Sequence, residues 1–334
     1  LFLIPFLNFN FFFLSWFWLV GIIHLLENKN GKPIEIGILF GIPSIFFALY
    51  WGTWTINNLT GAGFLSSFLV HFTYSFYESI FYVIVFFVLG LVIIKENRKV
   101  YRYGFFIFFY IFLENFFPRM FPYKLGNTQI LFKELSQLIS YAGLNVLTIF
   151  VLVTNISIYE LIFKKNIRFF CILLSFFFVI FFSGKSLIHN HSKIDTDSNI
   201  ISIAVVQPNQ NLNNLININN SINKNTYLTV WPEGSLDRLK IKDKKDISNF
   251  KENFLKKFEA RSKFILFGVI YQNNEGYHNA GLLIDEKIDL IDIYFKNRLM
   301  IFGEYYPFSF IISKIIPIYD SFVTLEKGTI RPLM

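Results

Sequence analysis

The sequence has 334 residues, of which 54% are hydrophobic, 20% aromatic and only 16% charged, and 45 residues are Phe. An ordinary soluble domain carries roughly 25% charged residues, so this composition argues against a purely cytosolic globular enzyme. The formal net charge of +8 fits a polyanion partner or a membrane surface equally well, and it does not by itself indicate a nucleic-acid partner.

The charged residues divide the chain into two parts. Residues 1–191 hold 13 Lys or Arg and 7 Asp or Glu, whereas residues 192–334 hold 18 and 16. The change falls in the polar stretch of residues 189–198, where we expect a domain boundary. We therefore predict a transmembrane helical domain over residues 1–191 and a second, water-exposed domain over residues 199–334.

Six apolar runs in the first part predict six membrane helices, because a bilayer core about 30 Å thick needs roughly 20 apolar helical residues. They cover residues 2–26, 35–56, 64–94, 103–117, 138–163 and 169–188. The fourth run is short, and residues 5–10 allow a re-entrant or interfacial segment.

The basic residues of the short loops predict the orientation of these helices. The first, third and fifth loops carry nine Lys or Arg, and the second and fourth carry three. Because basic loops stay in the cytoplasm, the odd loops are predicted to lie there. With six spans, the second domain would then lie on the outer side of the membrane.

Several small or polar residues lie within the apolar runs. Gly37 and Gly41 form a pair with the spacing that lets two membrane helices approach closely. Glu78, Glu114 and His71 lie within or near apolar runs, where an ionisable group is either satisfied by a partner or functional. We favour the first interpretation and keep the second open.

The second part of the chain has short segments rich in Ile, Val, Tyr and Phe, which are typical of β-strands. Strands are predicted over residues 201–206, 227–231, 264–271, 280–285 and 290–295. Residues 246–262 have apolar side chains at helical spacing, and the Asn-rich residues 209–225 are interpreted as a loop. This alternation of strands with a helix predicts an α/β layered fold.

Two acids and a lysine follow predicted strands or lie close to one. Glu233 comes after the strand that ends at Trp231, Lys296 follows Phe295, and Glu304 lies a few residues further on. Taken singly, each is more often a solvated charge. Brought together, a carboxylate and an ammonium can serve as general base and oxyanion stabiliser in acyl transfer, which still requires a nucleophile.

Several short motifs follow one another in a particular order. They are Trp231-Pro232-Glu233, Phe267-Gly268, Tyr277-His278-Asn279, Tyr294 to Leu299 and Phe302-Gly303-Glu304-Tyr305-Tyr306-Pro307, with Pro5 to Phe9, Phe117 to Tyr123, Leu125-Gly126 and Gln129 in the apolar part. In this order and spacing they resemble the apolipoprotein N-acyltransferase family, a membrane branch of the nitrilase superfamily. The resemblance runs along nearly the whole chain.

The resemblance implies a Glu-Lys-Cys triad on a nitrilase-like αββα sandwich. By position, Glu233 would be the general base that deprotonates the thiol, Lys296 would stabilise the tetrahedral oxyanion, and Glu304 would be a second carboxylate that orients the substrate. The family's cysteine takes an acyl group from a phospholipid and passes it, through a thioester, to the amine of a diacylglyceryl-cysteine.

The resemblance also implies the partners and the location. The partners are a phospholipid acyl donor, the diacylated N-terminus of a bacterial apolipoprotein and the membrane, with no nucleic acid. No cofactor is implied, and no metal site is expected, because the chain has one Cys and its five His are not clustered. The expected location is the bacterial inner membrane, with the second domain on the periplasmic side.

The chain departs from the family at the nucleophile. The family's cysteine lies downstream of the Phe-Gly-Glu segment, whereas no Cys follows Glu304 in this sequence, and Cys171 lies in an apolar run. We therefore expect a fragment truncated at both ends, with an incomplete nitrilase-like domain over residues 199–334, that is inactive as it stands.

Two other functions stay open. One is a membrane-tethered nitrilase-type amidase, which would release ammonia from a small amide without a lipid donor. The other is a non-catalytic membrane lipid-binding or transport protein whose second domain is only a soluble cap. A reading frame with no cysteine soon after Met334 would favour this third function.

Overall fold

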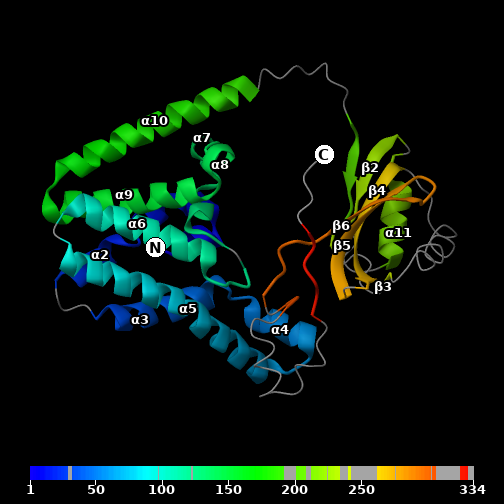
Figure 1. Ribbon diagram of the computed structural model, residues 1–334, viewed down its shortest axis with the longest axis horizontal. Coiled ribbons are helices and arrows are strands. Elements are labelled where there is room, and N and C mark those ends of the chain that lie inside the picture. The colour runs from blue at the N-terminus through cyan, green and yellow to red at the C-terminus, as the bar shows by residue number, and fades with distance from the viewer. Residues whose placement is uncertain are drawn as a thin grey trace. The chain divides into compact units, whose positions relative to one another are not determined.

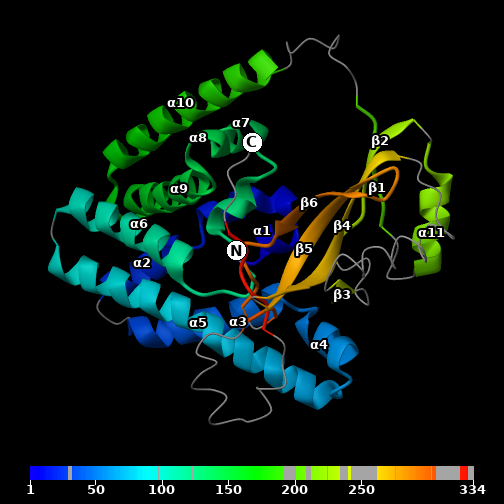
Figure 2. The same ribbon diagram turned by 45° about the vertical axis from the view of Figure 1, so that its right-hand side comes forward.

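The computed structural model divides the chain into two compact units, Leu1–Asp195 and Thr196–Met334. It describes residues 1–28, 32–96, 98–121, 123–191, 201–207, 212–223, 225–233, 240–241, 262–274, 276–301, 303–305 and 324–329. Helices make up the first unit and a sheet with one helix makes up the described part of the second (Figures 1 and 2). The predicted helix over residues 246–262 lies outside the described residues, except for Ser262, which begins a strand.

Ten α-helices and two 3-10 helices form the described part of the first unit. They are α1 (Ile4–Leu7), η1 (Phe9–Trp16), α2 (Val20–Glu27), α3 (Pro33–Ala48), α4 (Gly52–Thr60), α5 (Phe64–Lys95), α6 (Lys99–Phe116), η2 (Leu125–Gln129), α7 (Lys133–Ser136), α8 (Ile139–Ala142), α9 (Asn145–Lys164) and α10 (Ile167–His191). Large apolar side chains from α2, α5, α6 and α9 form its core.

Four helical segments among the described residues are long and apolar enough to cross a membrane. They are Phe9–Glu27, Phe64–Lys95, Asn145–Lys164 and Ile167–His189. The helices Pro33–Ala48 and Gly52–Asn58, bent by 53°, give a fifth if they form one broken span. Over the fourth predicted run lies α6, which has only 18 residues and includes Lys99, Arg102 and Glu114. The helices indicate a membrane protein, and six spans remain a prediction.

The first predicted span is not one straight helix. Residues 2–26 are divided among α1, η1 and α2, and the irregular backbone between them is hydrogen-bonded by side chains. The Asn155 amide donates to the Ser15 carbonyl at 2.8 Å and accepts from the Leu19 N–H at 2.9 Å, and the Gln129 amide donates to Ser15 Oγ at 2.8 Å. Such partners allow non-helical backbone within an apolar helical bundle, because no water is needed to satisfy it.

The fifth predicted span, residues 138–163, is also interrupted. Gly143 has a φ of 63°, in the left-handed region that glycine adopts without steric cost, and it ends α8. The long helix α9 then begins at Asn145. Hydrophobicity alone does not reveal this break, because the residues on both sides are apolar.

The glycine pair of α3 lies against α5, as its spacing predicts. A Cβ added at Gly37 would lie 2.5 Å from Val83 Cα, and one at Gly41 would lie 2.7 Å from Ser79 Cβ. The two backbones therefore approach more closely than any larger residue would allow.

We expect Gly37→Ala to lower the stability of the helical unit by about 1–3 kcal/mol, because α3 and α5 must move apart. Thermal unfolding of the chain in detergent micelles measures this loss. Gly104→Ala in α6 is the matched control, since no atom lies within 4 Å of a Cβ there. Equal unfolding temperatures for the two variants would show that the close approach of α3 and α5 does not contribute to the stability of the helical unit.

In the described part of the second unit, six strands form a small mixed sheet. They are β1 (Ile203–Val205), β2 (Thr226–Val230), β3 (Lys240–Ile241), β4 (Ser262–Asn273), β5 (Gly276–Asp285) and β6 (Leu290–Phe295). The order is β1-β2-β4-β5-β6, with β3 also paired to β4. The pairs β1–β2, β2–β4 and β3–β4 are parallel, and β4–β5 and β5–β6 are antiparallel. The nitrilase-like sandwich remains a prediction.

The interpretation of residues 209–225 as a loop was wrong, because Leu212–Ser221 form the helix α11. Leu215 is fully buried in the cluster that includes Ile265 and Phe267 of β4, and Ile216 packs against the same cluster. Burial of these apolar side chains outweighs the low helix propensity of the many Asn residues.

Candidate functional site

The three predicted site residues come from segments that follow β2 and β6. Glu233 lies three residues beyond the end of β2, and its segment is attached to β4 because the Trp231 N–H donates to the Leu266 carbonyl at 2.9 Å. Lys296 follows β6 directly, and its N–H donates to the Asn279 carbonyl of β5 at 2.8 Å. Glu304 lies in the turn that follows, where its carbonyl accepts from the Leu325 N–H at 2.8 Å.

The structure brings all three side chains together. Lys296 Nζ lies 2.9 Å from Glu304 Oε1 and 3.2 Å from Glu233 Oε1. One ammonium thus bridges two carboxylates that are 71 positions apart in the chain. This proximity is compatible with the predicted general base and oxyanion stabiliser, and it does not test those roles.

A fourth residue, Asn279, belongs to the same cluster and was missed as a site residue. Its side-chain amide donates to Glu304 Oε1 at 2.7 Å and also to Glu233 Oε1. The strand register explains its place, because Ala280 of β5 pairs with Phe295 of β6, so Asn279 lies beside Lys296. Only the pairing of β5 with β6 reveals this contact, and pairing cannot be read from one motif.

The two carboxylates differ in environment. The side chain of Glu304 is 10% exposed, that of Lys296 32% and that of Glu233 63%. Glu304 Oε2 also accepts from the Met300 N–H at 2.7 Å, so both of its oxygens have protein partners. Glu233 is the carboxylate that is open to a substrate or to water.

Neighbouring groups shift the pKa values of the buried partners. Burial raises the pKa of Glu304. Hydrogen bonds from the Met300 N–H, Asn279 and Lys296 together lower the pKa by more than burial raises it, so it lies below 4.5. Burial lowers the pKa of Lys296, but its bonds to Glu304 and Glu233 raise it more, and the result lies above 10.5. Both shifts favour the charged forms.

These directions predict how the cluster contributes to stability as pH changes. Glu304 has a lowered pKa in the folded state, so its contribution is present above pH 4.5 and is lost as pH falls through the folded-state pKa. Lys296 has a raised pKa, so its contribution is present below pH 10.5 and is lost as pH rises through the folded-state pKa.

Thermal unfolding from pH 3 to pH 7 checks the acid side of this window. We expect Glu304→Gln to unfold at a lower temperature than the unmodified chain at neutral pH, and the difference to narrow below about pH 4.5. A difference that is constant across this range would show that the charge of Glu304 does not stabilise the fold.

The ionisable residues singled out within the apolar runs, Glu78, Glu114 and His71, have partners within the first unit. Glu114 accepts from the Leu125 N–H at 2.7 Å and from the Thr148 hydroxyl at 3.0 Å. Glu78 accepts from the Tyr74 hydroxyl at 2.7 Å, and His71 Nδ1 lies 2.9 Å from the Thr53 hydroxyl. These contacts agree with the favoured interpretation that such side chains are satisfied by partners.

The single cysteine and the acidic and histidine residues give no further centre in the described segments. Cys171 is an exposed residue of α10, a candidate membrane span. No group of three or more His, Cys, Asp or Glu among the residues that the structure describes could hold a metal ion.

Comparison with known proteins gives one informative match. No protein-family profile matches the chain. The chain is 23% identical over 345 aligned residues to a protein of Wigglesworthia glossinidia brevipalpis named apolipoprotein N-acyltransferase. The alignment covers 97% of the chain and 68% of that relative. This modest similarity along nearly the full chain supports the resemblance drawn from the motifs.

Proposed function

We propose that this chain carries part of the machinery that N-acylates the N-terminal diacylglyceryl-cysteine of bacterial lipoproteins. The acyl donor would be a phospholipid, and the acyl group would pass through a cysteine thioester. The observation that carries the proposal is the cluster of Glu233, Lys296 and Glu304, which joins one ammonium to two carboxylates at 2.9 and 3.2 Å. The named relative supports the choice of reaction.

The proposed chemistry assigns one task to each charged group. Glu233 takes the proton of the nucleophilic thiol, and the thiolate attacks the ester carbonyl of the phospholipid. Lys296 stabilises the oxyanion, and the lysophospholipid leaves with the proton that Glu233 returns. The amine of the acceptor then attacks the thioester, which forms the amide and restores the thiol.

The remaining parts of the proposal concern the position of the nucleophile, the fold and the location of the protein in the membrane. We place the nucleophile, as the motif order implies, after the Phe-Gly-Glu segment that contains Glu304. The same proposal includes six spans and a nitrilase-like sandwich. It also places the protein in the inner membrane, with its second unit on the periplasmic side. The apolar helices support a membrane protein, and the mixed sheet supports an α/β second unit.

An acyl-transfer assay tests the proposal directly. The complete reading frame would be expressed, and membranes would be supplied with a labelled phospholipid and a diacylated lipoprotein peptide. We expect the label to move to the peptide amine only when both substrates are present. Ammonia release from small amides without any lipid would instead indicate an amidase. Lipid binding without either reaction would indicate a non-catalytic lipid-binding protein.

A further inference from the structure

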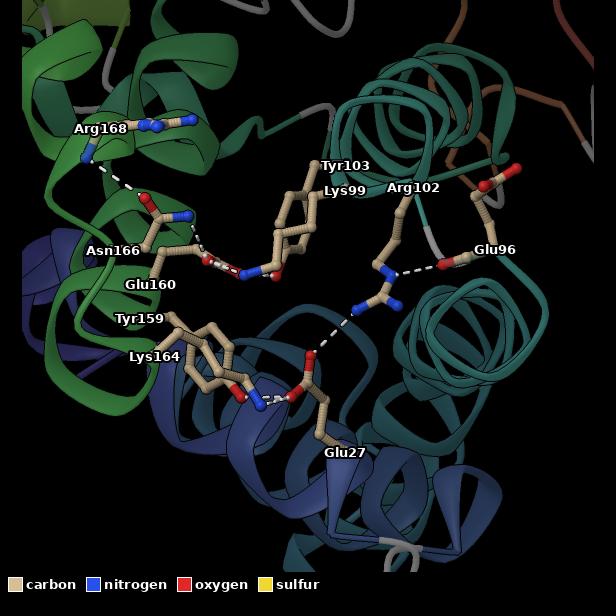
Figure 3. Close-up of polar contacts among 10 residues, drawn as sticks. All are labelled: Glu27, Glu96, Lys99, Arg102, Tyr103, Tyr159, Glu160, Lys164, Asn166 and Arg168. Atoms are coloured by element: carbon tan, nitrogen blue, oxygen red, sulfur yellow. Dashed lines mark hydrogen bonds and ion pairs between the residues drawn. The ribbon is translucent and has the colours of Figure 1, made fainter.

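One end of the helical unit carries a cluster of charged side chains that the proposed function does not use. The end of α2, the start of α6, the end of α9 and the start of α10 meet there (Figures 1 and 3). Glu27 of α2 accepts from Arg102 Nη1 at 3.1 Å and from the Tyr159 hydroxyl at 2.7 Å, and it also pairs with Lys164. The carboxylate of Glu27 therefore already has three partners.

The second carboxylate, Glu160 of α9, is satisfied in the same way. Its side chain is fully buried, and it pairs with Lys99 and accepts from the Tyr103 hydroxyl at 2.7 Å. The Asn166 amide donates to it at 3.3 Å. The carboxylates of Glu27 and Glu160 are thus occupied by Lys99, Arg102 and Lys164.

Other basic residues at the same end make no such pairs. Lys95, Lys165 and Arg168 are exposed, and none of their side chains forms an ion pair or a hydrogen bond with any residue that the structure describes. In Figure 3 the only contact drawn for Arg168 is through its backbone N–H, which donates to Asn166 Oδ1 at 3.3 Å. Positive charge is therefore left over on the outside of the cluster.

Hydrogen bonds to Glu160 hold the turn between α9 and α10 in position. The Asn166 N–H donates to the Glu160 carbonyl at 3.0 Å, and the Asn166 side chain bonds the Glu160 carboxylate. Lys165 has a φ of 51°, in the left-handed region that favours glycine. The turn thus holds Lys165 and Arg168 in a set arrangement before any ligand binds.

Apolar side chains flank this basic turn. Ile162 is 56% exposed and Phe163 is 42% exposed at the end of α9, and Ile167 is 63% exposed at the start of α10. Both helices are candidate membrane spans. Exposed apolar groups beside unpaired basic groups match the boundary between acyl chains and phosphate groups of a bilayer.

We propose that the α9–α10 turn binds the phosphate group of an anionic phospholipid through Lys165 and Arg168, with the lipid chains against Ile162 and Ile167. Glu27 and Glu160 keep their ion pairs with Lys99, Arg102 and Lys164, so lipid binding does not have to break any of these pairs. Net negative charge is the selecting property, because a zwitterionic lipid brings its own cation to the phosphate. This proposal does not depend on acyl transfer.

Native mass spectrometry of the chain in micelles that contain equal amounts of phosphatidylglycerol and phosphatidylethanolamine tests the proposal. We expect the unmodified chain to retain phosphatidylglycerol preferentially. The variant Lys165→Gln/Arg168→Gln should bind it about 30-fold more weakly, which corresponds to about 1 kcal/mol for each basic residue near a lipid surface.

Two further variants make the outcome specific. Lys263→Gln/Lys287→Gln removes the same charge from two exposed residues of the second unit, and its lipid retention should equal that of the unmodified chain. The swap Lys165→Arg/Arg168→Lys keeps the charge and should keep the preference. Equal retention by the glutamine variant and the unmodified chain would overturn the proposal, as would an equal loss in the second-unit control.

Discussion

Replacing Glu233 by Gln is expected to lower the rate of acyl transfer at least about 100-fold, the usual contribution of a general base. Glutamine has the same shape and its carbonyl oxygen still accepts from the Asn279 amide, so the cluster keeps its geometry. What it loses is the ability to take a proton. Glu233 is suited to this change because its side chain is 63% exposed, so the substitution places no unpaired group in the core.

The measurement is the initial rate of label transfer from phospholipid to a diacylated peptide by the complete gene product. Glu286→Gln, an exposed carboxylate of the same unit, is the matched control and should leave the rate unchanged. An equal unfolding temperature for both variants shows that folding is intact. A Glu233→Gln enzyme that keeps its rate within a few fold would contradict the general-base assignment.

Replacing Glu78 by Ala is expected to destabilise the helical unit by about 3–5 kcal/mol, because it leaves the buried charge of Arg119 without a counter-ion. Arg119 Nε lies 3.4 Å from Glu78 Oε2, and the two side chains are 4% and 0% exposed. The guanidinium also lies 3.9 Å from the ring centre of Phe81 and 4.6 Å from that of Tyr123. Aromatic faces alone do not replace a carboxylate.

Thermal unfolding in detergent micelles measures this loss. The double variant Glu78→Leu/Arg119→Leu removes both charges and should recover most of the stability, because an apolar pair replaces a buried ion pair at little cost. Glu35→Ala breaks the exposed pair with Lys32 and should cost less than about 1 kcal/mol. If Glu78→Ala lowered the stability by no more than Glu35→Ala does, the buried pair would not be needed for folding.

The strands of the second unit are the part of the fold that local sequence patterns predict best. β1, β2, β4, β5 and β6 all overlap predicted strands, because β-branched and aromatic residues between polar turns leave few alternatives. Glu233 and Lys296 stand out because each lies just beyond such a strand. That they meet depends on β2 and β6 being joined through β4 and β5, which is a property of the sheet and not of either segment.

The features that were missed depend on contacts between distant residues. The break before α2 is stable because the Asn155 amide donates to the carbonyl of Ser15, which lies 140 positions away in the chain. The helix α11 forms because Leu215 reaches the core of the sheet. Asn279 enters the site through the register of two strands. Each of these requires knowledge of a neighbour in space, which periodicity along the chain does not contain.

The length of α5 determines how it can lie in a bilayer. Its 32 residues rise about 48 Å, whereas the hydrocarbon layer is about 30 Å thick. Tilting alone would have to reach about 50°, beyond the 0–40° that membrane helices adopt. Even at a tilt of 40°, about 6 of these residues must therefore lie outside the hydrocarbon. The first half of α5 buries Ser67 and His71 and exposes Phe64, Leu65 and Val70, so whichever end projects, α5 carries apolar side chains as a rigid rod into the lipid headgroups.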